Sequence, residues 1–130
     1  MNISRNRRLS GFIGVFLILL AGGVIALLGT DLLAEPLLLA QATLLGLAGV
    51  CDIVAATDNA LTERWGWYQW SGLGNILLGL SLPLAFVDSG DQLFILAVTA
   101  IGGLSLAAMG LDMAMFHGKY TRGERLDQER

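Results

Sequence analysis

The sequence predicts an all-α integral membrane protein, a four-helix bundle built from two tandem transmembrane hairpins. Of its 130 residues, 55% are apolar and 15% are charged, whereas soluble domains have about 45–50% and about 25%. The mean hydropathy is +0.66. Four apolar stretches reach the roughly 20 residues that a helix needs to cross a bilayer. A chain of this length is expected to form one compact unit, without a second domain of any size.

The four spans are expected at about residues 9–29, 36–56, 66–87 and 92–116. The second begins at Pro36, a favourable first helical residue because its missing N–H would have no partner there. In the third, Pro83 removes a backbone donor near the end of the span, so we expect a kink or an early helix end. A polar cytoplasmic tail, residues 117–130, follows the fourth span.

The distribution of charge predicts that both termini and the middle loop are cytoplasmic. Every Lys and Arg lies before the first span, between the second and third, or after the fourth: Arg5, Arg7, Arg8, Arg64, Lys119, Arg122, Arg125 and Arg130. The other two loops carry only acids: Asp31, Glu35, Asp88 and Asp91. Basic residues are retained on the cytoplasmic side. We therefore expect a multi-pass protein of the cell membrane, with the lipid bilayer as a partner.

Aromatic residues cluster at the cytoplasmic start of the third span, where Trp65, Trp67 and Trp70 surround Tyr68. Amphipathic rings are stable at headgroup depth. We interpret the three tryptophans as interfacial anchors. The alternative is an aromatic cage for a ligand.

The chain contains an internal repeat of about 60 residues. Shifting the sequence by that length places Asp31 on Asp91 and Asp52 on Asp112, and acids are scarce in this composition. We interpret the two halves as a duplicated hairpin. Both copies begin in the cytoplasm, so they form the parallel type of repeat, related by an axis along the membrane normal.

Each half pairs a Gly-punctuated apolar helix with a helix rich in small residues that ends in a Gly-then-Asp stretch. The segments are GFIGVFLILLAGGVIALLG with LLGLAGVCDIVAA, and WSGLGNILLGLSLPLAF with AIGGLSLAAMGLDMA. This pattern covers most of the chain and resembles the HdeD-like small membrane proteins. The resemblance implies a bacterial or archaeal cytoplasmic-membrane protein linked to acid or envelope stress. The resemblance implies no catalytic residues.

Small residues spaced four apart predict the helix-packing seams, because helices in lipid associate through close contact and interhelical hydrogen bonds. The predicted seam residues are Gly22 and Ala26, Ala42 and Gly46, Ser71 and Gly79, and Gly103 and Ala107. Asn75 lies between Ser71 and Gly79 on the same face. It is expected to bond Gln41 or backbone of the first span; a substrate contact is the alternative.

Asp52 and Asp112 are the only ionisable side chains inside the expected spans, and intramembrane carboxylates prompt a functional hypothesis. One interpretation is structural: hydration, or pairing with the nearby basic residues. The other is that the two lie together across the repeat axis and handle protons or cations, with Asn75 and Gln41 lining the path.

The sequence also excludes a disulfide scaffold, a Cys/His metal site and a nucleic-acid-binding protein. The one cysteine and one histidine cannot form an intramolecular disulfide or a Cys/His metal cage, and a net charge of −3 gives no general attraction to nucleic acid. No phosphate-binding loop or nucleophile motif is present, so we expect neither an enzyme nor a cofactor.

The expected function is therefore that of a non-catalytic membrane protein acting through helix association. It would be a homo-oligomer or bind another membrane protein, with a role in acid or envelope stress if the resemblance holds. The alternative is a small oligomeric proton- or cation-linked transporter or channel that uses Asp52 and Asp112.

Overall fold

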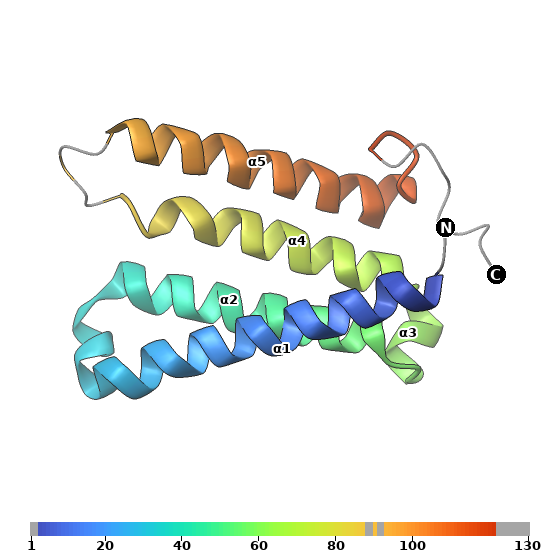
Figure 1. The fold of residues 1–130 in the computed structure, drawn as a ribbon, viewed down its shortest axis with the longest axis horizontal. Helices are drawn as coiled ribbons and strands as arrows, with labels where there is room; N and C mark the ends of the chain where they lie inside the picture. The colour runs from blue at the N-terminus through green and yellow to red at the C-terminus, as the bar shows by residue number, and fades with distance from the viewer. Residues whose placement is uncertain (1–2, 88–89, 91–92, 122–130) are drawn as a thin grey trace.

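The computed structural model describes residues 3–87, 90 and 93–121 and shows a helical protein (Figure 1). The described residues contain no strand, which confirms the all-α class. The elements, in chain order, are α1 (Ile3–Leu28), the 3-10 helix η1 (Gly29–Ala34), α2 (Pro36–Ala56), α3 (Ala60–Arg64), α4 (Trp67–Leu84) and α5 (Leu93–Phe116).

Three stretches of helix are long and apolar enough to cross a membrane: Ser4–Ala34, which joins α1 to η1, then α2 and α5. The third expected span, α4, is not among them. It has 18 residues and includes the polar Gln69, Ser71 and Asn75. Because α4 packs between α2 and α5, its polar side chains can lie against protein rather than lipid.

The four long helices pack in an open series. α1 packs on α2, α2 on α4, and α4 on α5. In Figure 1, α1 crosses in front of α2, and α4 and α5 lie above them. Within the described residues, α1 and α5 share no packing interface comparable with these three. The series therefore does not close into a ring, and an opening is left between α1 and α5.

The described Lys and Arg residues all lie at one end of the structure. α1 begins and α5 ends at the same end of the molecule as α3, and η1 lies at the other end (Figure 1). The Lys and Arg residues at the α3 end are Arg5, Arg7, Arg8, Arg64 and Lys119. Asp31 and Glu35 are in or beside η1. Asp88, Asp91, Arg122, Arg125 and Arg130 lie outside the described residues.

The helix bounds differ from the expected spans in three places. α1 includes the basic segment from Arg5 to Arg8, and α3 is a short helix that was not expected. It begins because the Asn59 side chain accepts hydrogen bonds from the Leu61 and Thr62 N–H groups, a capping interaction. α4 ends at Leu84, directly after Pro83, so the early end predicted there is confirmed.

Each hairpin is held by backbone approaching backbone at glycines. In the second hairpin, a Cβ atom on Gly79 would clash with the Gly103 carbonyl oxygen and come within 3.3 Å of the Ala107 Cβ. In the first, a Cβ on Gly14 would lie 2.7 Å from the Gly49 oxygen. Such contacts admit no side chain. Gly79, Gly103 and Ala107, three of the predicted seam residues, meet at the contact in the second hairpin. Gly14 and Gly49 form a seam that was not predicted.

The remaining predicted packing residues divide into two groups. Ala42 is 4% exposed, and Gly46 faces Ala21 of α1 at ordinary contact distance. Ser71 is buried on α4. The prediction that Gly22 and Ala26 line a seam is wrong within the chain, because both are exposed and a Cβ on Gly22 would meet nothing within 4 Å. The α1–α2 crossing lies nearer the start of α1, at Gly14, and leaves this face of α1 uncovered.

Candidate functional site

A polar groove opens between the four long helices near the α3 end of the molecule. Its volume is about 260 Å³. The residues with polar groups in its lining are Asn6, Ser10, Asp52, Trp67, Ser71 and Asn75. The apolar lining residues are Leu9, Ile13, Leu78, Leu106 and Met109. Residues of α1 and α5 both line it, so it occupies the place where the open series of helices fails to close.

Asp52 is the charged group of the polar groove. It is 3% exposed, because α2 packs between α1 and α4 at this level. Ser10 of α1 donates a hydrogen bond to its carboxylate at 3.0 Å, and Ser71 of α4 is buried and lines the same groove. Both side chains are neutral. Within the described residues, no basic side chain forms an ion pair with Asp52.

Gly74 makes room for this carboxylate. A Cβ atom at Gly74 would lie 3.1 Å from Asp52 Oδ1 and 3.2 Å from the Ala48 carbonyl oxygen. Those distances are tighter than ordinary side-chain contacts, so any larger residue would press on the carboxylate. The glycine therefore lets α4 approach α2 at the acid.

The side-chain amides of Asn75 and Asn6 also line the groove. Asn75 lines the groove, and its Nδ2 lies 3.7 Å from the Met113 sulfur, a weak acceptor. Asn6 Nδ2 is buried and has no hydrogen-bond partner among the described residues. Gln41 does not line the groove, and the described residues contain no hydrogen bond between Gln41 and Asn75. Asn75 thus faces the Asp52 groove rather than the partner expected for it.

Asp112 has a different and structural environment. Its carboxylate accepts hydrogen bonds from the Thr121 N–H at 2.7 Å, the Thr121 hydroxyl at 2.6 Å and the Tyr120 N–H at 3.2 Å. Gly118 N–H bonds the Asp112 carbonyl oxygen, and His117 has a φ of +59°, the geometry of a helix C-terminal cap. The tail therefore starts as a turn folded back on α5. The two aspartates do not share one site.

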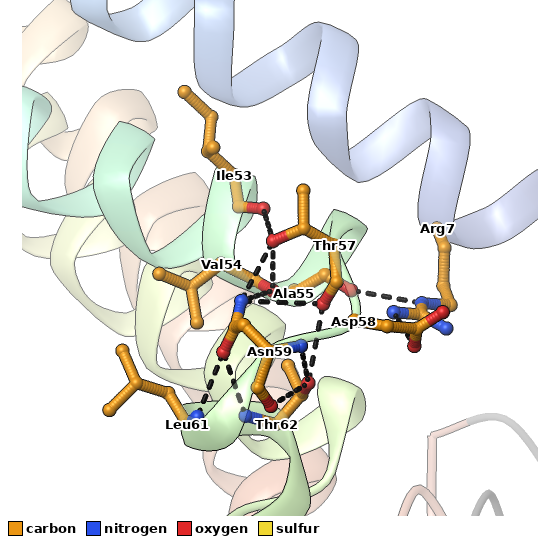
Figure 2. A network of polar contacts seen from close by, with 9 residues as sticks. All are labelled: Arg7, Ile53, Val54, Ala55, Thr57, Asp58, Asn59, Leu61 and Thr62. Atoms are coloured by element: carbon orange, nitrogen blue, oxygen red, sulfur yellow. Dashed lines mark hydrogen bonds and ion pairs between the residues drawn. The ribbon is translucent and has the colours of Figure 1, made fainter.

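None of the described basic residues forms an ion pair with either aspartate. Arg7 forms an ion pair with Asp58 at 2.7 Å and donates from Nε to the Ala55 carbonyl oxygen at the end of α2. Figure 2 shows this pair beside the polar network that shapes the α2–α3 connection. In that network the Asn59 amide donates to the Thr57 hydroxyl at 2.8 Å. This corner is a structural joint between α1, α2 and α3.

The tryptophans take different positions at this end. Trp65 and Trp70 meet edge to face with ring centroids 5.7 Å apart, and Trp65 is exposed, as an interfacial anchor would be. Trp67 instead lines the polar groove. Tyr68 packs edge to face with His117 at 5.4 Å.

Asn6 and Ser10 were missed by the sequence reasoning. Asn6 precedes the first apolar stretch and Ser10 lies near its start. Polar residues are common at the end of a membrane span, so neither residue indicated a site. Their four-residue spacing places them on one helix face, but only the crossing of α1 with α2 brings that face to Asp52. Within the described residues, no three His, Cys, Asp or Glu side chains gather closely enough to hold a metal ion.

The fold and the groove define a small helical protein with membrane-length apolar helices and one buried acid in a polar cleft. The chain belongs to a family of unknown function, DUF7994, whose model matches residues 5–127. No curated protein and no solved structure matches the chain.

Proposed function

We propose that the protein is a four-span integral membrane protein that acts by association, either with a second copy or with another membrane protein. The observation that carries this proposal is the uncovered face of α1 at Gly22, Gly23 and Ala26. Small residues at this spacing let helices approach closely in lipid, as Gly79 and Gly103 do inside the chain. Among the described residues, nothing lies within 4 Å of a Cβ atom placed on Gly22 or Gly23.

The test is the mass of the complex extracted in mild detergent. Gly22→Leu should fold normally, because nothing lies within 4 Å of the added Cβ, and it should lower the fraction of associated protein. Gly102→Leu is the matched control, since Gly102 is equally open but lies on α5. An unchanged mass distribution for Gly22→Leu would contradict the proposal.

The spans are proposed to run with the α3 end in the cytoplasm of a cell membrane. The clustering of the described Lys and Arg residues at that end supports this orientation. The likeness to the HdeD-like proteins supports a role in acid or envelope stress. That role predicts that deletion of the gene lowers survival of the source organism after acid or envelope shock, and that the intact gene restores it.

A proton- or cation-linked transporter is the second candidate. One observation favours it: Asp52 is buried beside a groove and forms no ion pair within the described residues. Asp112 contributes less to this candidate, because its carboxylate is bonded to the turn after α5. Proton or cation flux into vesicles should then depend on Asp52 and survive Asp112→Asn.

A further inference from the structure

Among the described residues, no positively charged side chain forms an ion pair with the buried carboxylate of Asp52. A buried carboxylate is costly unless it is paired and hydrogen-bonded. The Ser10 hydroxyl supplies a hydrogen bond without charge, and the guanidinium group of Arg7 is bonded to Asp58 and Ala55. A cation that enters the groove would complete the site.

The lining of the groove indicates the kind of cation. The lining combines the Asp52 carboxylate, two hydroxyls and two amides with the aliphatic side chains of Leu9, Ile13 and Leu106 and with Met109. A bare metal ion would leave the apolar side chains without a partner. An organic cation would satisfy both kinds of lining, and Trp67, which also lines the groove, adds an aromatic ring of the kind that attracts alkylammonium groups.

We propose that the polar groove binds a small organic cation, a monovalent ammonium whose charge lies against Asp52 and whose apolar body lies against Leu9, Ile13 and Leu106. A volume of about 260 Å³ is just below the range of about 300–1,000 Å³ typical of pockets for drug-sized ligands, so the ligand is small. The site lies within one copy of the chain. It shares Asp52 with the transporter candidate but requires neither transport nor association.

The experiment is a calorimetric titration of the full-length protein in lipid nanodiscs with benzyltrimethylammonium chloride. Wild type should bind saturably. Asp52→Asn should weaken binding by at least about tenfold, the loss expected when a buried charge pair is broken. Asp31→Asn is the matched control, because it removes an exposed carboxylate of η1 that lies outside the groove. It should bind as wild type does.

Two further measurements keep the test independent of folding defects in Asp52→Asn. Leu106→Trp fills the groove while leaving the acid in place, and it should also abolish binding. The uncharged analogue neopentylbenzene should not bind, and sodium chloride should compete no better than choline chloride at equal ionic strength.

The proposal is overturned by a wild type that shows no saturable binding, by equal affinity in Asp52→Asn, or by equal binding of the uncharged analogue. Specific competition by sodium would replace the organic cation with a metal ion and would also overturn it. Because binding is measured rather than flux or mass, a failure here leaves the association and transport tests unaffected.

Discussion

At the residue scale, Asp52 and Asp112 show how position in a fold decides what an acid does. A shift of 60 residues superimposes them in the sequence, yet Asp112 accepts bonds from backbone N–H groups of the turn after α5, whereas Asp52 accepts from the Ser10 hydroxyl beside a groove. The first arrangement stabilises a helix end. The second leaves a buried acid with a neutral partner.

Asp112→Ala should loosen the turn after α5. The substitution removes the acceptor of the Tyr120 and Thr121 N–H groups, and each lost hydrogen bond to a charged group costs about 1.5–3 kcal/mol. Hydrogen exchange should accelerate at these two amides and stay unchanged in α2. Asp112→Asn, which keeps an acceptor oxygen, should exchange more slowly than the alanine variant. Equal protection in wild type and Asp112→Ala would contradict the assignment.

At the element scale, α4 is the central helix of the structure. It packs against α2 on one side and α5 on the other. Its polar residues face those neighbours or the groove: Gln69 donates to the Ala114 carbonyl oxygen, and Ser71 lines the groove. Its seam with α5 has glycine on both helices at two levels, Gly72 with Gly110 and Gly79 with Gly103. Backbone contact therefore fixes the spacing of this hairpin.

Gly103→Ala should destabilise the second hairpin, and Gly102→Ala should not. A Cβ at Gly103 would clash with the Gly79 carbonyl oxygen, whereas one at Gly102 would meet nothing within 4 Å. Overpacking of this kind costs about 1–3 kcal/mol. The melting temperatures of the two variants in the same detergent give the comparison. Similar values would mean that α4 and α5 do not meet at these glycines.

Prediction from sequence succeeded where the signal is local. The range 36–56 of α2 follows from Pro36 and an unbroken apolar run, and the α4 stop follows from Pro83. The site depends on longer-range geometry. Ser10 meets Asp52 only because two glycines let α1 and α2 cross there. A small-residue pair such as Gly22 and Ala26 looks the same in the sequence whether it packs against a helix of the same chain or against another protein. The sequence therefore cannot show where the partner helix is.

At the scale of the whole molecule, the structure is polarised along the helix axes. The described Lys and Arg residues and the polar groove share one end, and the acidic η1 segment occupies the other (Figure 1). An organic cation would therefore meet the groove from the end that the charge rule assigns to the cytoplasm.

Cysteine labelling in intact cells tests this orientation. The buried Cys51 is first replaced by Ala, and single cysteines are introduced at Thr30 in η1 or Glu63 in α3, both exposed and at opposite ends. A membrane-impermeant maleimide should label Thr30→Cys in intact cells and Glu63→Cys only after the membrane is opened. The reverse pattern would invert the proposed topology.

The open series of helices also has a mechanical consequence. The α2–α4 seam is the main joint between two hairpins that are each clamped by glycines. Rotation of one hairpin about that joint would change the separation of α1 and α5 while both clamps stay intact. Because the groove is lined from α1 and α5 alike, its width is the quantity that such a hinge controls.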